Sequence, residues 1–258
     1  MIRSRTRDPE DYRTAAFQPP FLRATDTTTR MTLAAIVFDF DGLIVDTETP
    51  GFISWQEVYE EFGATLNIDD WRHATGYIGG FDPAVHLEHL LGRQLDWSQI
   101  IPKREARNWD LTIQARTLPG IEALFRSARE RQLRIGVASN SGNGWVEDGL
   151  QRLGLRGYVD VVVTRDMVIN PKPAPDIYLK TVQTLCVEPH LAVALEDSEP
   201  GCRAAKEAGL KAVAIPNQFS ERQDLTIADL VVKSAEELDL DRLADLAAGK
   251  VALPRDRP

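Results

Sequence analysis

The sequence predicts an α/β protein, with a doubly wound parallel sheet that carries an inserted, small α-helical domain. From residue 118 onward, strand-like and helix-like segments alternate, and a repeated β-α-β order is typical of a parallel sheet with helices on both faces. Residues 51–116 instead show helical periodicity and no convincing strand, so we expect them to stand outside the sheet. An apolar run at 34–38 supplies a strand that this helical segment separates from the others.

The first strand is expected at residues 34–38, where a run rich in β-branched and aromatic residues stops at Asp39-Phe40-Asp41-Gly42. This pattern is typical of a buried strand that feeds a tight loop. In open α/β sheets, ligands bind just beyond the carboxyl ends of the strands, so Asp39 and Asp41 stand where a substrate and a metal are expected. On its own, the segment is explained about equally well by a plain Asp-Gly turn.

Residues 51–116 are expected to form the inserted helices. Apolar residues at helical spacing give the first helix one apolar face: Phe52, Trp55, Val58, Tyr59 and Phe62. The spacing of His86 and His89 could fit a metal site, but no acids stand nearby at ligand spacing. We therefore interpret these two histidines, and His73, as packed or solvated side chains.

The alternating part of the chain predicts the remaining elements. Strands are expected at 133–138, 159–164, 191–195, 211–215 and 230–232, and helices at 121–132, 146–153, 176–185, 201–208 and 234–248. Since the first strand belongs to the same sheet, we predict a discontinuous core domain formed by residues 33–50 and 117–248. Residues 51–116 are then a cap domain inserted into it.

Residues 1–32 differ from the rest, with six arginines, no lysine and little apolar periodicity. We predict a flexible N-terminal extension. Met31 stands directly before the first strand, so either Met1 or Met31 could be the start of the protein.

Composition excludes several classes of protein. The net charge of -9 argues against a general nucleic-acid binder, because phosphate backbones are held by surplus Lys and Arg. No apolar run reaches the length of a membrane span. Cys186 and Cys202 are too few for a disulfide scaffold, so we expect a cytoplasmic protein with two buried free thiols. The oligomeric state cannot be predicted.

Polar residues follow three further strands of the predicted sheet. They are Ser139 and Asn140, Lys172, and Glu196 and Asp197. Each alone is explained as a helix cap or a solvated turn residue. Together with Asp39 and Asp41 at the same edge of one sheet, they supply carboxylates for Mg²⁺, a nucleophile, a hydroxyl group and a cation.

In this combination the sequence resembles the haloacid dehalogenase superfamily of phosphohydrolases. The four matching motifs are Asp39-Phe40-Asp41-Gly42-Leu43, Ala138-Ser139-Asn140-Ser141, Pro171-Lys172-Pro173 and Glu196-Asp197-Ser198-Glu199-Pro200-Gly201. They occur in the family's order, and the resemblance covers about residues 33–240. It implies a Rossmann-like core with a small helical cap, near the β-phosphoglucomutase-like branch.

The resemblance also implies a role for each motif residue. Asp39 is the nucleophile that forms an aspartyl-phosphate, and Asp41 is the general acid and base. Mg²⁺ is held by Asp39, the Asp41 backbone carbonyl and Asp197, with Lys172 beside it as a second positive charge. Ser139 holds the nonbridging phosphate oxygens, assisted by Asn140. Glu196 is expected to orient a metal-bound water from the second layer around the metal.

The predicted function is Mg²⁺-dependent hydrolysis of a small phosphorylated metabolite, such as a sugar phosphate. The alternative is a β-phosphoglucomutase-like sugar phosphomutase. Mutases of this branch carry a histidine ten positions after the second aspartate of the first motif and an arginine in the cap, where this chain has Gly51 and Gly79. Because a bisphosphate intermediate needs a distal cation, hydrolysis is favoured, although Arg72 or Arg93 could substitute.

Three other classes fit the sequence less well. A phospho-receiver domain would place its acidic pair before the phosphate acceptor and would have no helical insertion. A metal-free dehalogenase of the same superfamily does not need Asp41 or Asp197. A nucleotide-binding protein lacks support because the chain has neither a P-loop nor a dinucleotide-binding glycine pattern.

Overall fold

The computed structural model describes residues 33–72 and 81–250. The predicted extension at 1–32, with Met31, lies outside the described residues, as do His73 and Gly79. In the two described ranges, no helix is both long enough and apolar enough to cross a membrane.

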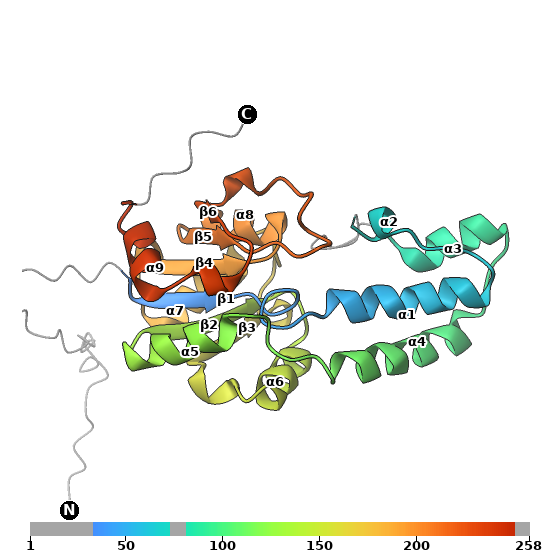
Figure 1. The fold of residues 1–258 in the computed structure, drawn as a ribbon, viewed down its shortest axis with the longest axis horizontal. Helices are drawn as coiled ribbons and strands as arrows, with labels where there is room; N and C mark the ends of the chain where they lie inside the picture. Colours follow the sequence, from blue (N-terminus) through green and yellow to red (C-terminus); the bar gives the residue numbers. More distant parts are fainter. Residues whose placement is uncertain (1–32, 73–80, 251–258) are drawn as a thin grey trace, which may run out of the picture. The chain divides into compact units, whose positions relative to one another are not determined.

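The described residues contain one six-stranded parallel sheet (Figure 1). Its strands are β1 (Ala35–Phe38), β2 (Arg134–Ser139), β3 (Val161–Thr164), β4 (Ala192–Glu196), β5 (Lys211–Ala214) and β6 (Leu230–Val231). They lie in the order β3-β2-β1-β4-β5-β6, so the sheet grows from β1 first to one side and then to the other. In doubly wound sheets, the ligand crevice lies where the strand order reverses, which here is the carboxyl end of β1 between β2 and β4.

Both faces of the sheet are buried, which explains why its strands are apolar along most of their length. The covering helices are α5 (Ile121–Glu130), α6 (Asn143–Arg152), α7 (Asp176–Leu185), α8 (Glu199–Glu207) and α9 (Leu240–Ala247). Ile36 and Phe38 of β1 pack with apolar residues of α5, α6 and α9. Ala35 and Val37 pack on the other face with residues of α7 and α8. The Phe38 ring stacks on Phe125 of α5, with ring centroids 4.2 Å apart.

Among the described residues, four helices lie between β1 and α5 and form the inserted helical part. They are α1 (Glu48–Glu61), α2 (Ile68–Arg72), α3 (Pro83–Leu91) and α4 (Trp97–Thr112). Trp55, Tyr59 and Leu87 belong to an apolar cluster centred on these helices. His86 is packed, as expected, with its Nδ1 2.9 Å from the Tyr59 hydroxyl. The predicted fold class is confirmed, whereas the exact division of the chain into domains stays a prediction.

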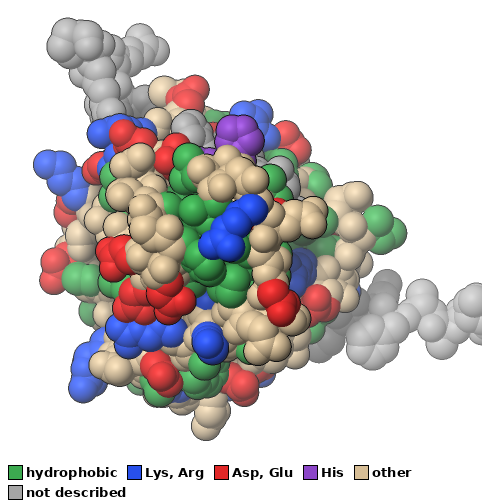
Figure 2. All heavy atoms as spheres, turned by 90° about the vertical axis from the view of Figure 1, so that its right-hand side faces the viewer, with side chains coloured by type: hydrophobic (Ala, Val, Ile, Leu, Met, Phe, Trp, Pro, Cys, Tyr) green, Lys and Arg blue, Asp and Glu red, His purple; other side chains and the backbone are tan. Residues whose placement is uncertain are grey.

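The outer end of the inserted helices shows charged side chains of both signs around a hydrophobic centre (Figure 2). Val85 and Leu90 of α3 are exposed apolar side chains of the inserted helices. On this face, acidic and basic groups of the described residues are interspersed, which agrees with the absence of surplus Lys and Arg in the sequence.

Two predictions are wrong. A single helix was expected over 234–248, but the chain forms a 3-10 turn at Ala235–Glu237 and then α9. The break arises because Asp239 adopts an extended conformation and caps α9, accepting a hydrogen bond from the Arg242 N–H at 2.7 Å. Cys202 is buried as predicted, but Cys186 is exposed, because it ends α7 in a left-handed conformation at the surface. Further 3-10 turns occur at Arg156–Tyr158, Arg165–Met167, Pro189–Leu191 and Leu225–Ile227.

Candidate active site

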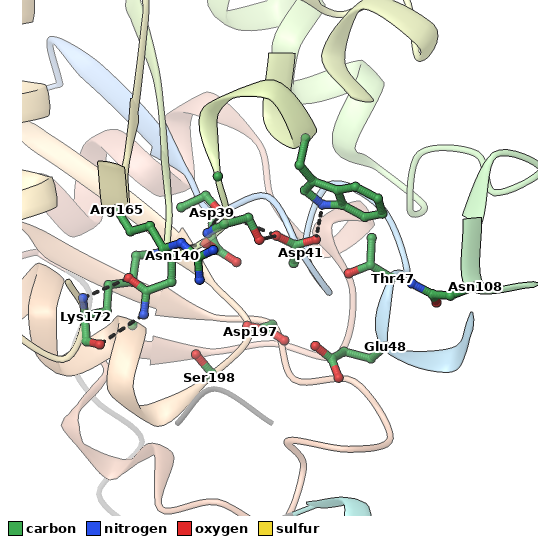
Figure 3. A pocket seen from close by; sticks show the side chains of 15 residues that line it. Asp39, Asp41, Thr47, Glu48, Asn108, Asn140, Arg165, Lys172, Asp197 and Ser198 are labelled. Atoms are coloured by element: carbon green, nitrogen blue, oxygen red, sulfur yellow. Dashed lines mark hydrogen bonds and ion pairs between the residues drawn. The ribbon is translucent and has the colours of Figure 1, made fainter. Parts of the chain in front are cut away.

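The polar residues that follow β1, β2, β3 and β4 line one cavity of about 520 Å³ (Figure 3). Asp39 comes directly after β1, Ser139 ends β2, Lys172 lies in the loop after β3, and Asp197 comes directly after β4. The parallel register brings the carboxyl ends of these strands to one edge of the sheet. The structure thus brings together the residues that the four sequence motifs single out.

Lys172 is the centre of the buried charges. Its Nζ lies 2.6 Å from Asp39 Oδ1, 2.6 Å from Glu196 Oε1 and 2.8 Å from the Ala138 carbonyl oxygen. An ammonium group has three N–H donors, so these three acceptors satisfy it completely. Tyr178, which motif reasoning missed, also donates its hydroxyl hydrogen to Glu196 Oε1.

Asn140 holds the loop that carries Lys172. Its Oδ1 accepts a hydrogen bond from the Lys172 backbone N–H at 2.9 Å, and its Nδ2 donates to the Lys172 carbonyl at 3.0 Å. This pair of bonds ties the loop after β3 to the end of β2. Asn140 also lines the cavity, so its predicted contact with phosphate stays a prediction beside this bracing contact.

Burial shapes the protonation of these groups. Desolvation raises the pKa of Asp39 to about 8, against the opposing attraction of Lys172. Burial by itself would lower the pKa of Lys172, but the charges of Asp39 and Glu196 and their hydrogen bonds raise it above its usual value. Burial also raises the pKa of Asp197, and the nearby charges of Asp39 and Glu196 add to this rise. Full ionisation of Asp39 and Asp197 therefore needs positive charge beyond that of Lys172.

Three carboxylates at this floor fit a small hard cation. Asp39, Glu196 and Asp197 each offer an oxygen, and these oxygens lie within 4.8 Å of one another. Glu196 Oε2 is buried and finds no hydrogen-bond partner among the described residues, so one acceptor remains available. Mg²⁺ prefers oxygen ligands of this kind, and the residues present fit it. Glu196 belongs to this group without lining the cavity itself, so both its expected place behind the metal ligands and the lesser alternative of direct ligation stay predictions.

Gly42 allows the loop after β1 to approach Asp197. A Cβ atom at this position would lie 2.4 Å from Asp197 Oδ2 and 2.8 Å from Asn217 Nδ2. The backbone is also left-handed here, with φ +76°. Asn217 donates from Nδ2 to Asp197 Oδ2 at 2.8 Å and so orients this carboxylate, a contact that no sequence motif indicated.

The Asp41 carboxyl group is hydrogen-bonded to a different set of residues from the one around Lys172. Its Oδ2 accepts hydrogen bonds from Ser141 Oγ at 2.5 Å and from Ser139 Oγ at 3.4 Å. Its Oδ1 accepts a hydrogen bond from Trp145 Nε1 at 2.9 Å. The second motif includes Ser141 but gave it no role, and motif reasoning missed Trp145. The available signal was that Trp145 lies in the first turn of α6, the helix that directly follows the Ser139-Asn140-Ser141 segment.

The helical part also contributes to the cavity. Thr47 and Glu48 at the start of α1, and Asn108 on α4, line its mouth, and Arg165 lines it from the end of β3 (Figure 3). Arg72 is engaged elsewhere, since its guanidinium donates to the Gln218 carbonyl at 2.9 Å and to Glu221 at 2.9 Å. Arg93 lies over the Phe62 ring, 5.9 Å from its centroid. Neither of these arginines lines the cavity.

Replacing Lys172 with methionine is expected to lower the free energy of unfolding by about 3–5 kcal/mol, because it leaves buried carboxylates without a cation. The loss should be largest near pH 8 and smaller near pH 5. Removing the ammonium raises the carboxylate pKa values further, so protonation at low pH relieves the repulsion. Urea denaturation at both pH values measures this effect.

Lys180→Met is the matched control, since this lysine lies on α7 and is exposed, bonded to the Met167 carbonyl. Its substitution should change the free energy of unfolding little at either pH. Equal losses in the two variants would show that Lys172 does not balance a buried charge.

Comparison with known proteins agrees with this geometry. The family model described as haloacid dehalogenase-like hydrolase matches residues 36–215. YhcW of Bacillus subtilis, which bears the name of a phosphatase, is 36% identical over 213 residues, which cover 83% of this chain and 97% of that protein. The fructose-1-phosphate phosphatase YqaB of Escherichia coli is 33% identical over 195 residues, which cover 70% of this chain and 96% of YqaB.

A solved structure shows the same fold. CbbY from Rhodobacter sphaeroides, in complex with phosphate, superimposes with a TM-score of 0.65 at 30% identity, covering 80% of this chain and 96% of CbbY. The family match spans β1 to the end of β5, and therefore all four motifs and the inserted helices. The chain belongs to the haloacid dehalogenase-like hydrolase family, within its capped, phosphatase-containing branch.

Proposed function

We propose that the protein is a Mg²⁺-dependent phosphomonoester hydrolase that acts on a small phosphorylated sugar or related metabolite through an aspartyl-phosphate on Asp39. The observation that carries this proposal is the position of Asp39. Asp39 lines the cavity at the point where the strand order of the sheet reverses. It forms an ion pair with Lys172, and its carboxylate lies close to those of Glu196 and Asp197.

In the first step, the Asp39 carboxylate attacks phosphorus, and the bond between phosphorus and the leaving oxygen breaks. Lys172 keeps Asp39 oriented through its Nζ and offsets the repulsion between a carboxylate and a phosphate dianion. Mg²⁺, held by Asp39, Asp197, the Asp41 carbonyl and the nearby Glu196, would supply further positive charge at the transferring group. Ser139 would donate its hydroxyl to a nonbridging oxygen.

Asp41 would move the protons of both steps. As a general acid it protonates the departing oxygen, and as a general base it then takes a proton from the water that hydrolyses the aspartyl-phosphate. The partners of Asp41 support this role, because its carboxyl group is hydrogen-bonded to hydroxyls and an indole rather than to the Lys172 ammonium group.

Hydrolysis is favoured over phosphomutase activity by the placement of positive charge. Among the described residues, the cavity is lined by two cationic side chains, Lys172 and Arg165, and both follow β3. The inserted helices contribute Thr47, Glu48 and Asn108 but no cation to this lining. The segment at 73–80 contains neither Lys nor Arg in its sequence. Among the described residues, the inserted helices would therefore offer a bisphosphate intermediate no cationic partner in this cavity, and water should intercept the phosphoenzyme.

The relatives favour phosphorylated sugars as the substrate class. Fructose-1-phosphate phosphatase YqaB is 33% identical, and a phosphorylated carbohydrates phosphatase of Thermotoga maritima is 30% identical. β-Phosphoglucomutase of Bacillus subtilis is also 30% identical, so sequence similarity does not separate the two activities. Our preference for hydrolysis is supported instead by the lack of a cation from the inserted helices among the described residues that line the cavity.

A panel of phosphomonoesters tests this function. It should include fructose 1-phosphate, hexitol phosphates, glucose 6-phosphate, glycerol phosphates, phosphoglycolate and nucleotides, with inorganic phosphate as the product measured. We expect release from at least one sugar phosphate. In parallel, β-glucose 1-phosphate with added glucose 1,6-bisphosphate should yield little glucose 6-phosphate. Isomerisation faster than phosphate release would establish a mutase instead.

Mg²⁺ should also stabilise the protein in the absence of substrate. An ion that binds only the folded state at 100 times its dissociation constant adds about 2.7 kcal/mol, which corresponds to a rise in melting temperature of roughly 5–10 °C. Differential scanning fluorimetry with Mg²⁺ and with EDTA measures this rise. Asp197→Asn should remove most of it, and an undiminished rise in that variant would place the ion elsewhere.

A further inference from the structure

Trp145 contacts Asp41 in a way that the phosphatase mechanism does not itself require. The Trp145 Nε1–H donates to Asp41 Oδ1 at 2.9 Å, whereas Asp41 Oδ2 is bonded to the hydroxyls of Ser141 and Ser139. The two oxygens of this carboxyl group therefore have chemically different neighbours. Figure 3 shows Asp41 with the dashed hydrogen bonds that its carboxyl group makes within the cavity.

The difference determines where a proton can reside on Asp41. An indole N–H can only donate, so a proton on Oδ1 would face another hydrogen and would lose this bond. A serine hydroxyl can both donate and accept. Oδ2 can therefore be satisfied in both states, accepting from Ser141 when it is ionised and donating to Ser141 when it is protonated.

We propose that Trp145 is a positioning residue that holds Asp41 Oδ1 as a permanent acceptor and thereby makes Oδ2 the oxygen that gives and takes the proton in the hydrolysis proposed above. This inference rests on the proposed function. During departure of the sugar, the Oδ2–H bond breaks, its electron pair stays on Asp41, and the proton goes to the leaving oxygen. In the second step, Oδ2 takes one proton from the attacking water.

Packing keeps the indole in place. Trp145 lies on α6, and its ring makes an edge contact with Trp109 of α4, with centroids 5.8 Å apart and an interplanar angle of 60°. Such aromatic contacts restrict the ring while leaving the Nε1–H free to point at the carboxyl group. The ring that orients Asp41 thus packs against an inserted helix that also supplies Asn108 to the cavity mouth.

The test uses Trp145→Phe, which removes the N–H but keeps an aromatic ring. Two substrates separate proton transfer from folding, because a sugar leaving group needs a general acid and p-nitrophenolate does not. For fructose 1-phosphate, kcat/KM should fall about tenfold, a part of the roughly 10²–10⁴-fold that general acid catalysis supplies. For p-nitrophenyl phosphate, kcat/KM should stay within about twofold of the wild-type value. The parameter kcat/KM covers only the steps up to departure of the leaving group, and for this substrate none of those steps needs a general acid.

The Trp97→Phe variant is the matched control. Trp97 also donates its indole N–H to a carboxylate, Glu88 Oε1 at 2.8 Å, but within the inserted helices. Neither Trp97 nor Glu88 lines the catalytic cavity. This control should leave the ratio of the two kcat/KM values unchanged.

A double-mutant cycle with Asp41→Asn completes the test. Adding Trp145→Phe to Asp41→Asn should cost nothing further on fructose 1-phosphate, because the positioned group is already gone. Equal losses on both substrates, an unchanged ratio, or a full additional loss in the double variant would each overturn the positioning role. A wild-type protein that releases phosphate from neither substrate would instead refute the proposed function itself.

Discussion

Replacing Asp39 with asparagine is expected to abolish phosphate release, with a loss of about 10⁴-fold or more, the scale on which removal of a nucleophile acts. The amide matches the carboxylate in shape, but it cannot form the acyl phosphate. The fold should survive, because Lys172 keeps Glu196 as a second partner at 2.6 Å. Burial already disfavours the ionised form of Asp39, whose pKa is raised to about 8, so a neutral side chain suits the site.

The measurement is steady-state phosphate release from the best substrate of the panel, with circular dichroism to confirm the fold. Asp148→Asn is the matched control, since Asp148 is an exposed carboxylate of α6 that does not line the catalytic cavity. This control should retain wild-type activity. Wild-type rates in Asp39→Asn, once contamination is excluded, would remove Asp39 as the nucleophile.

Replacing Asp41 with asparagine should lower turnover of sugar phosphates by roughly 10²–10⁴-fold, the contribution usual for general acid and base catalysis. The site should keep its geometry, because an asparagine oxygen can still accept the Trp145 N–H bond. With p-nitrophenyl phosphate the leaving group needs no proton, so Asp39 should still be phosphorylated. Hydrolysis of the phosphoenzyme should then be slow, since the group that activates water is missing.

Rapid-quench kinetics with p-nitrophenyl phosphate measures this difference. Asp41→Asn should release a burst of p-nitrophenolate that is stoichiometric with enzyme, followed by a slow steady state. Equal slowing of the burst and the steady state would mean that Asp41 supports the attack on phosphorus itself and not the proton transfers.

The sheet and the motif residues could be predicted because each rests on a local pattern. The apolar run of β1, followed by Asp39 and Asp41, indicates both a buried strand and the position of its carboxyl end. The topology of a parallel sheet then brings Ser139, Lys172 and Asp197 to the same edge. These inferences need only hydrophobic periodicity and chain order.

The supporting contacts could not be predicted in this way. Tyr178 reaches Glu196 from α7, and Asn217 reaches Asp197 from a loop after β5, so both depend on side-chain directions that sequence spacing does not determine. Trp145 could not be assigned to the site either, because nothing local in the sequence indicates that its N–H points at Asp41. The broken terminal helix was missed because Asp239 favours a cap over helix interior, a local competition that periodicity does not report.

The most direct test of the proposed mechanism is to locate the phosphoryl group on the enzyme. The Asp41→Asn protein is mixed with Mg²⁺ and p-nitrophenyl phosphate, quenched in acid, digested and mapped by mass spectrometry. We expect one added phosphoryl group on the peptide that contains Asp39, and none when Asp39→Asn is combined with Asp41→Asn. A phosphoryl group on Ser139 or another side chain, or an unmodified protein during continued phosphate release, would contradict the mechanism.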